Sequence, residues 1–429
     1  MAKKKIKTET TEEVVETEVV EKTKAPKKKA GTKKANAKEK LTAGDIESQL
    51  SAFLEKETGV KLQGIADVDA VSKYIDTGNY SLNYAITGDL TKGLPSGRIY
   101  TLEGESGRGK SLQSCRIALE NARTGGISII IDIENALTLD FLTKIANNDI
   151  ELAKKVKIIQ GIYTIEDLQN WLNNLIAFQK NKGAEKEILV VVDSWSILSS
   201  KHELAVVEEN KGKKDMSKAV AARMLLRSLA GQFKECKITP ILVLHLTANI
   251  GVMFGDKTVP ASHGNAALFM SSTRTQLYAT QELLDANKNP VGTVLNFKTK
   301  KNRFTYKNKT AKVAFYFSGP KTGIDRFSGL AETLVSWGIM ECSVKKTEKK
   351  AFEITPTATL TFDGESFKRK EFEDFILNYE GGEKAFITEV NQRLDKSIKG
   401  VETSDDPSNF EDSDDASDDY SDYDFDVPN

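Results

Sequence analysis

The 429-residue sequence has few cysteines and no long apolar run. Its three cysteines, Cys115, Cys236 and Cys342, are widely spaced, so they match no metal-binding pattern and cannot all form disulfides. This cysteine usage is typical of a reducing compartment, and we expect a cytoplasmic protein. The longest apolar runs are short, strand-like stretches such as residues 188–192, and no apolar segment follows the lysine-rich start. The sequence therefore predicts neither a transmembrane helix nor a secretory signal.

The two ends of the sequence carry opposite net charges. Residues 1–40 contain thirteen lysines against seven glutamates and few large apolar residues, whereas residues 401–429 contain twelve acids and neither lysine nor arginine. We predict that both segments are disordered. Two interpretations stay open for them. They keep the protein soluble, or the basic arm contacts phosphates while the acidic tail competes with DNA or recruits a partner, such as a single-strand-binding protein or a loader.

Apolar strand-like runs alternate with helical stretches through the middle of the chain. Five such runs predict an α/β fold with a mostly parallel sheet and helices on both of its faces: residues 99–103, 127–132, 155–160, 188–193 and 240–246. Three later runs are separated by turn residues and predict antiparallel strands at the edge of the sheet: residues 276–280, 293–299 and 312–318.

A complete P-loop follows the first of these runs and precedes a helix-like stretch. Its eight residues are Gly104, Glu105, Ser106, Gly107, Arg108, Gly109, Lys110 and Ser111. The glycines let the backbone turn its N–H groups inward, and the helix adds its positive end, so that the charges of a triphosphate are met by donors held close together. In this motif the lysine reaches the β- and γ-phosphates, and the Ser111 hydroxyl coordinates Mg²⁺. The sequence therefore predicts an ATP site.

Two acids follow apolar strands that end at the same edge of the predicted sheet. Asp193 ends the run 188–193 and has the setting of a carboxylate that holds Mg²⁺ through water. Glu134 follows the run 127–132 and is placed to orient or deprotonate an attacking water. An acid in such a place is also a common helix cap, so the strand pattern alone leaves both roles open for Glu134.

Residues 74–340 resemble the RecA family of strand-exchange ATPases, and especially the UvsX-type bacteriophage recombinases. The resemblance rests on residues 75–78, 81–82 and 93–99 at the entry to the P-loop, and on the block 132–137. It implies a RecA-like P-loop NTPase core and favours Glu134 as the catalytic base. It also implies that Phe141 stacks on adenine, although a core phenylalanine is the alternative.

The resemblance also implies two positions that connect DNA with ATP. His245 is similar to the γ-phosphate sensor that precedes the family's second DNA loop, and the alternative is a histidine of the core. Lys301 and Arg303 resemble the paired cations that reach the ATP of the neighbouring subunit. By themselves, two cations after a strand are usually just solvated.

Two long segments resemble the DNA loops of the family. The first spans residues 206–217, and the second spans 250–266. Backbone N–H groups, lysines and an apolar wedge suit sequence-tolerant binding of single strands. The residues that we expect to bind DNA are Lys211, Lys213, Lys214, Arg223, Gly251, Val252, Met253, Phe254, Gly264, Asn265 and Ala266.

We divide the chain into five parts. They are a lysine-rich arm (1–40), a segment in the place of the family's polymerisation arm (41–73), a RecA-like ATPase core (74–344), a small C-terminal domain (345–400) and an acidic tail (401–429). The subfamily signals are mixed, because the P-loop and residues 251–255 look more like bacterial RecA. His245, Arg303 and residues 324–329 look more like the phage type.

The resemblance predicts a DNA-dependent ATPase that forms helical filaments on single-stranded DNA and exchanges strands with a homologous duplex. The alternatives are a hexameric RecA-fold helicase or branch-migration motor and a single-strand coat that does not hydrolyse ATP. The sequence shows neither the cysteine-rich zinc module nor the N-terminal collar of such motors. The intact Lys110, Ser111, Glu134 and Asp193 argue against a coat.

Overall fold

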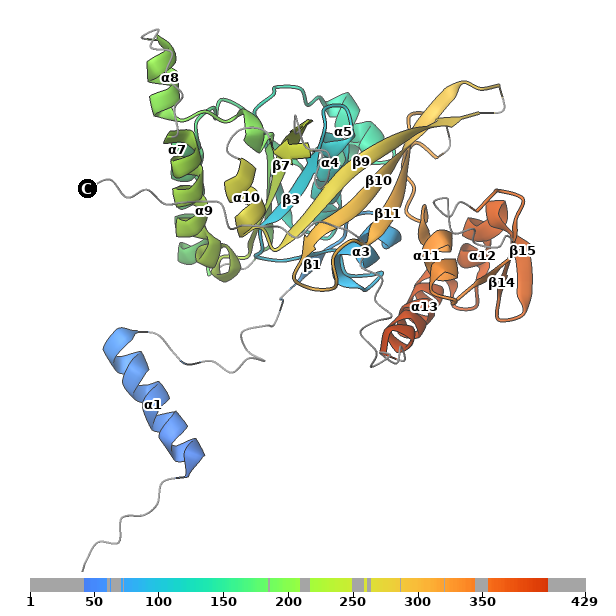
Figure 1. The fold of residues 1–429 in the computed structure, drawn as a ribbon, viewed down its shortest axis with the longest axis horizontal. Coiled ribbons are helices and arrows are strands. Elements are labelled where there is room, and N and C mark those ends of the chain that lie inside the picture. Colours follow the sequence, from blue (N-terminus) through green and yellow to red (C-terminus); the bar gives the residue numbers. More distant parts are fainter. Residues whose placement is uncertain are drawn as a thin grey trace, which may run out of the picture. The chain divides into compact units, whose positions relative to one another are not determined.

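A computed structural model describes residues 42–59, 62, 71, 73–183, 186–208, 217–248, 258–260, 264–285, 287–319, 321–343 and 354–399. The chain divides into two compact units, residues 1–70 and 71–429. Because the positions of these units relative to each other are not determined, we treat each by itself (Figure 1).

The described part of the first unit is helix α1 (Ala43–Thr58). Thr42 and Asp45 form a capping box at its start, and Gly59, with a left-handed backbone, ends it. Both are standard helix-end signals because they satisfy N–H and C=O groups that the helix leaves unpaired. The side chains of Ile46, Leu50 and Phe53 are about half exposed or more. Their spacing places them on one face of α1.

The second unit is built on a ten-stranded sheet (Figure 1). Nine strands follow the order β12-β11-β10-β9-β3-β7-β6-β4-β5, and β8 pairs with β7. Their bounds are β3 (Tyr100–Gly104), β4 (Ile127–Asp132), β5 (Lys157–Ile159), β6 (Ile188–Asp193), β7 (Ile238–Ala248), β8 (Thr258–Pro260), β9 (Thr273–Leu284), β10 (Pro290–Asn302), β11 (Thr310–Tyr316) and β12 (Gly323–Ile324). Two short strands, β1 (Tyr74–Ile75) and β2 (Leu94–Pro95), pair separately.

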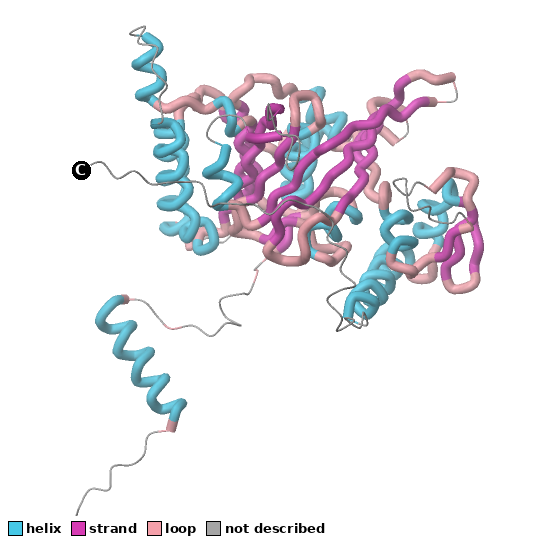
Figure 2. The backbone as a smooth tube through the Cα atoms, viewed as in Figure 1, coloured by secondary structure: helices cyan, strands magenta, loops and turns pink. Residues whose placement is uncertain are grey.

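Helices cover both faces of this sheet, as Figure 2 shows in cyan beside the magenta strands. They are α3 (Tyr80–Thr87), α4 (Lys110–Arg123), α5 (Leu139–Ile145), α6 (Ile150–Ala153), α7 (Ile165–Asn181), η1 (Trp195–Ile197), α8 (Lys201–Glu208), α9 (Ser217–Glu235) and α10 (Gly264–Met270). Among the described residues, no helix combines the length and apolar character needed to cross a bilayer.

The predicted α/β fold is confirmed, with parallel pairing from β9 through β3, β7, β6 and β4 to β5. The expected antiparallel strands β9, β10 and β11 extend the sheet on one side. The strand ending in Asp193 has the predicted bounds. However, β7 extends beyond the predicted run 240–246 to Ala248, so His245 lies three residues before the end of its strand.

Apolar side chains alternate between two cores on opposite faces of the sheet. Along β6, Leu189 and Val191 belong to one buried cluster, whereas Val190 and Val192 belong to the other. Successive strand residues point to opposite faces, so a strand buried on both sides is apolar throughout. This explains why β6 was recognisable as an unbroken apolar run.

The C-terminal part contains α11 (Leu330–Ser336), α12 (Phe372–Asn378), α13 (Gly382–Lys399), the short η2 (Arg369–Glu371) and a sheet of β13 (Glu341–Cys342), β14 (Thr359–Phe362) and β15 (Glu365–Lys368). Its aromatic core includes Phe362, Phe372 and Phe386 and extends to Tyr80 and Tyr84 of α3. The predicted boundary at residue 345 stays a prediction. The first strand of this small sheet, β13, precedes that boundary.

Candidate functional site

The P-loop connects β3 to α4, and two of its glycines have no room for a side chain. A Cβ atom on Gly104 would lie 2.8 Å from the carbonyl oxygen of Leu277. On Gly109, which has a φ of +86°, it would lie 2.7 Å from Cδ2 of Leu295. Close packing and a left-handed backbone therefore both require glycine here.

Helix α4 begins without a capping side chain. Its N-cap is Gly109, which makes no side-chain hydrogen bond, whereas Asn79 caps α3 and Thr138 caps α5. The first N–H groups of a helix have no partner within the helix, and the helix dipole places positive potential there. The start of this 14-residue helix therefore suits a phosphate group.

Lys110 lies buried at this helix start. Its Nζ atom donates a hydrogen bond to the carbonyl oxygen of Glu105, at 2.7 Å. Burial lowers the pKa of Lys110, while the carboxylates of Asp193, Glu134 and Glu105 act in the opposite direction. The ammonium group is thus held over the loop by a single neutral acceptor, and a phosphate oxygen is a stronger partner for it.

Four strands bring the remaining candidates to one edge of the sheet. In the strand registers, Gly104 pairs with His245, and Asp132 pairs with Asp193. Because β3, β7, β6 and β4 are parallel, their carboxyl ends meet at this edge, which is where ligands bind in open α/β sheets. The predicted convergence of P-loop, Glu134, Asp193 and His245 follows from this arrangement.

Asp193 is buried and lies beside the start of α4. Its pKa is raised to about 6, because burial and the nearby Glu134 raise it more than Ser111, Lys110 and His245 lower it. The Ser111 side chain lies close to this carboxylate. The peptide bond between Asp193 and Ser194 is cis. Two oxygen-bearing side chains, Ser111 and Asp193, thus stand next to each other.

These two residues fit a magnesium ion that is shared with a nucleotide. In the described part of the chain, no group of three or more histidines, cysteines and acids could hold a metal on its own. Mg²⁺ is usually bound by one or two protein oxygens together with water and substrate phosphates. Ser111 and Asp193, beside the free helix start, match this donor set.

Glu134 lies within hydrogen-bonding distance of the histidine on β7. The Nε2 atom of His245 is 2.9 Å from Oε1 of Glu134, and both side chains are partly exposed. The backbone N–H of His245 also donates to Oγ of Ser196. The candidate base and the candidate sensor are therefore direct neighbours, which sequence position alone did not reveal.

Asp132 holds the turn that carries Glu134. Its carboxylate accepts hydrogen bonds from the backbone N–H groups of Ala136 and Leu137 and from the side chain of Gln160, at 3.1 to 3.2 Å. Sequence reasoning did not assign this role to Asp132. The signal available in the sequence was an acid at the last position of the apolar run 127–132.

Phe141 lies on α5 and is partly buried against the core cluster that contains Leu142 and Ile145. This packing agrees with the core interpretation of Phe141, while stacking on adenine stays a prediction.

Most of the predicted DNA contacts fall outside the described residues. These are Lys211, Lys213, Lys214, Gly251, Val252, Met253 and Phe254. The described candidates lie on the flanking helices. Arg223 is exposed on α9, Asn265 is exposed on α10, and Ala266 is partly buried beside it. Gly264 is buried at the start of α10, where a Cβ atom would lie 2.5 Å from Cβ of Pro260.

Lys301 and Arg303 lie at the end of β10 and just after it. The Nζ atom of Lys301 donates to the carbonyl oxygen of Phe269 at 2.8 Å, at the end of α10. Burial lowers its pKa, and the nearby cations Arg303 and Arg274 lower it further. Arg303 is exposed. This places positive charge on the surface beside α10.

Two further interactions near the P-loop strand were missed by sequence reasoning. Glu103 of β3 is buried and accepts two hydrogen bonds from Arg274 of β9, at 2.8 and 3.1 Å. The side chain of Gln276, also on β9, donates to Thr258 of β8 at 3.3 Å. These contacts connect β9 with the P-loop strand and with β8, the strand that precedes α10.

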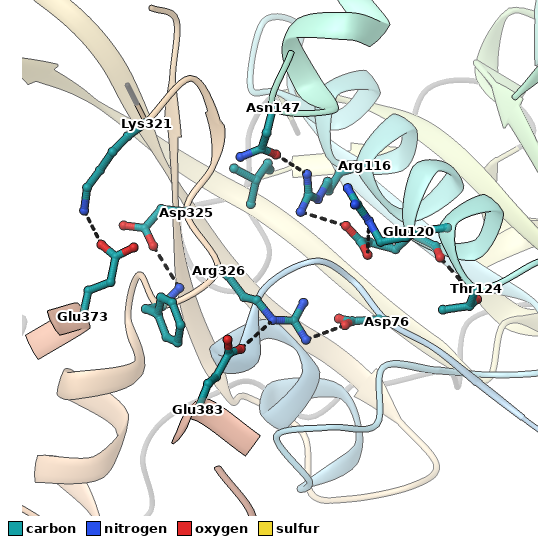
Figure 3. A pocket seen from close by; sticks show the side chains of 13 residues that line it. Asp76, Arg116, Glu120, Thr124, Asn147, Lys321, Asp325, Arg326, Glu373 and Glu383 are labelled. Atoms are coloured by element: carbon teal, nitrogen blue, oxygen red, sulfur yellow. Dashed lines mark hydrogen bonds and ion pairs between the residues drawn. The ribbon is translucent and has the colours of Figure 1, made fainter. Parts of the chain in front are cut away.

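A cavity of about 660 Å³ lies away from the P-loop (Figure 3). Its charged side chains already have partners. Arg326 forms ion pairs with Asp76 at 2.8 Å and with Glu383 of α13 at 3.5 Å. Arg116 of α4 pairs with Glu120 at 2.7 Å. We regard this cavity as part of the contact between the sheet domain and α12 and α13, because its charges neutralise one another.

Comparison with known proteins identifies the family. The RecA N-terminal domain family matches residues 46–324. "Protein RecA, chromosomal" of Lactococcus lactis subsp. lactis is 30% identical over 302 residues, which cover 68% of this chain and 72% of that protein. Protein RecA of Mycoplasma mycoides subsp. mycoides is 29% identical over 257 residues, or 58% of this chain and 68% of that protein. Protein RecA of Cereibacter sphaeroides is 27% identical over 282 residues, or 65% of this chain and 74% of that protein. The chain therefore belongs to the RecA family.

Proposed function

We propose that this protein is a DNA-dependent ATPase that forms helical filaments on single-stranded DNA and exchanges strands with a homologous duplex. As a member of the RecA family it is an ATP-binding and DNA-binding protein of recombination and repair. The observation that carries the finer proposal is the contact between His245 and Glu134. It joins the strand that leads into the second DNA segment to the residue that we assign as the catalytic base.

In this proposal, four side chains have separate roles in ATP hydrolysis. Lys110 leaves the Glu105 carbonyl and binds the β- and γ-phosphates, while the N–H groups at the start of α4 bind the neighbouring oxygens. Ser111 and Asp193 would hold Mg²⁺, which would neutralise charge on the phosphates. Glu134 orients the attacking water and takes its proton.

DNA binding can affect ATP hydrolysis through His245. This residue lies on β7, only three positions before the strand ends and the chain enters residues 249–257. DNA bound beside the end of β7 would move that strand end and, with it, the hydrogen-bond partner of Glu134. We propose that DNA selects the arrangement in which Glu134 is aligned for hydrolysis.

Two features favour head-to-tail assembly. Helix α1 carries an exposed apolar face with Ile46, Leu50 and Phe53, which suits burial against another copy of the chain. Lys301 and Arg303 offer surface cations that we assign to the ATP of the neighbouring subunit. Such heterologous contacts build an open helix when the rotation does not close.

We further propose that the protein is of the phage type and works in the host cytoplasm. His245, Arg303 and residues 324–329 support this subtype. The acidic segment 401–429 is a candidate docking site for a single-strand-binding protein or a loader, because its charge would complement a basic partner surface.

The test is ATP hydrolysis with and without single-stranded DNA, combined with negative-stain images of both mixtures. We expect DNA-stimulated turnover and helical filaments, and no turnover from a Lys110→Ala protein. Filaments without turnover would instead identify a coat, and closed rings would identify a translocating motor. A strand-exchange assay with homologous and unrelated duplexes then tests the pairing step.

A further inference from the structure

The turn between β10 and β11 carries a buried lysine without an acidic partner. Lys309 is 7% exposed. Its Nζ atom lies 4.0 Å from the ring centre of Tyr84 and 4.3 Å from that of Tyr306. Among the described residues, no nearby carboxylate raises its pKa. Burial alone lowers its pKa, to about 8. A buried ammonium group is unfavourable, so its place between two tyrosine rings calls for an explanation.

The lysine also lies at the carboxyl end of α3. Its Nζ atom is 3.5 Å from the carbonyl oxygen of Tyr84, one of the last carbonyls of that helix. A Cβ atom on Gly88, the C-cap of α3, would lie 3.5 Å from the same Nζ atom. The negative end of the helix dipole therefore supports the charge of Lys309 together with the two rings.

Asn302 attaches the other end of the same turn to α3. Its side-chain NH₂ donates to the carbonyl oxygens of Ile86, at 2.8 Å, and Ala85, at 3.3 Å. Its side-chain oxygen accepts hydrogen bonds from the backbone N–H groups of Phe304 and Thr305. Every polar atom of the amide group is thus used to hold the turn in one conformation against the helix.

Between these two attachments lies Arg303, which we assign to the neighbouring subunit's ATP. Lys301 immediately precedes Asn302, and Lys309 closes the turn through the hydrogen bond from Thr299 N–H to its carbonyl oxygen, at 2.9 Å. Arg303 itself is exposed. The position of its backbone is therefore set by the chain on either side, which Asn302 and Lys309 hold.

We propose that Lys309 is a positioning residue, which acts by holding the turn 302–309 on α3 so that Arg303 points at the nucleotide of the adjacent subunit. This inference rests on the proposed action of Arg303 in trans. It does not require Lys309 to touch the nucleotide. The charge of Lys309 matters because a neutral side chain would lose the cation–π attraction of the rings and the attraction of the helix end.

The test compares Lys309→Met, which removes the charge, with Lys309→Arg, which keeps it. The matched control is Lys307→Met, since Lys307 is an exposed lysine of the same turn. We expect Lys309→Met to lower the DNA-stimulated kcat by about tenfold or more, the scale of a desolvated cation–π contact. Lys309→Arg should retain most of the activity, and Lys307→Met should retain all of it. ATP affinity without DNA should not change in any of the three.

A mixing experiment separates a positioning role from general damage. Lys110→Ala subunits lack a working P-loop but carry an intact turn, whereas Lys309→Met subunits have the opposite defect. Mixing the inactive Lys110→Ala protein with the impaired Lys309→Met protein should restore part of the turnover, as mixing Lys110→Ala with Arg303→Ala should. If Lys309→Met is not rescued while Arg303→Ala is, the loss arises within the subunit and the inference is wrong.

The outcomes also separate this inference from the proposal on which it rests. Full activity of the Arg303→Ala protein would show that Arg303 does not act on the neighbouring subunit's ATP. Lys309 would then have no positioning role. An inactive Arg303→Ala with a fully active Lys309→Met would overturn only the role of Lys309. Should Lys309→Met fail to fold, Tyr306→Leu decides, because the ring of Tyr306 is half exposed and its loss leaves no hole in the core. Unchanged DNA-stimulated turnover in that variant would contradict the inference.

Discussion

His245 Nε2 lies 2.9 Å from Glu134 Oε1, although 111 positions separate the two residues in the sequence. The contact forms at the edge where β7 and β4 end, with β6 between them. It connects the strand that leads to the segment we propose to bind DNA with the turn that Asp132 holds. In our proposal, the two side chains therefore act together in ATP hydrolysis.

Glu134→Gln should slow hydrolysis strongly and leave ATP binding intact. A positioned general base contributes roughly 10²–10⁴-fold to rate, so a loss on this scale is expected in kcat. The measurement is single-turnover hydrolysis beside equilibrium ATP binding. Full turnover in this variant would show that Glu134 is not the base.

His245→Ala should reduce the stimulation by DNA more than the turnover without DNA. Because His245 touches Glu134, we expect the double variant with Glu134→Gln to be little worse than Glu134→Gln alone. A double-mutant cycle on DNA-stimulated turnover measures this coupling. Additive effects of the two substitutions would mean that His245 acts independently of Glu134.

Asp193→Asn should abolish Mg²⁺-dependent turnover and stabilise the protein without nucleotide at neutral pH. Burial raises the pKa of Asp193 to about 6 from 3.8, so between pH 4 and pH 6 the folded state binds more protons than the unfolded state. The stability of the natural protein therefore falls relative to Asp193→Asn as pH rises through this window, by at most about 3 kcal/mol. Urea unfolding of both proteins from pH 4 to pH 8 checks the sign. A stability difference that does not depend on pH would contradict the buried, ionised carboxylate.

Glu103→Gln should destabilise the fold by about 3–5 kcal/mol, the usual result of breaking a buried ion pair. The carboxylate of Glu103 is 1% exposed and accepts both hydrogen bonds from Arg274. The control is Asp140→Asn, since Asp140 pairs with Lys144 on the exposed face of α5 and such pairs contribute about 0.5 kcal/mol. Denaturant midpoints decide the comparison. Similar small effects at both sites would mean that the ion pair between Glu103 and Arg274 is not important for stability.

Replacing the exposed face of α1 should prevent filament formation without unfolding the protein. The side chains of Ile46, Leu50 and Phe53 are about half exposed or more, so their replacement by serine removes no buried side chain. Glu47→Ser, on the same helix, is the control. Light scattering and negative-stain images with DNA and ATP provide the readout. Normal filaments from the triple variant would exclude α1 from assembly.

The local parts of this protein were predictable from the sequence. The P-loop was recognised because eight consecutive residues carry all the conformational and chemical requirements of a phosphate site. Strands β4 and β6 were found with their observed bounds, because a strand buried on both faces is an unbroken apolar run. Asp193 followed directly, since it is the first polar residue after such a run. Strand β7 was less well delimited, because its last residues alternate and look like the start of a loop.

Strand register and packing determine contacts that could not be predicted from the sequence. The contact of His245 with Glu134, the pair of Glu103 and Arg274, and the enclosure of Lys309 by Tyr84 and Tyr306 each join residues from distant parts of the chain. Sequence spacing carries information about neighbours along one helix or strand, because the backbone repeats there at a known period. It carries none about which strands lie side by side. The sequence alone therefore determined the chemistry of the P-loop, and the tertiary structure decided which side chains face it.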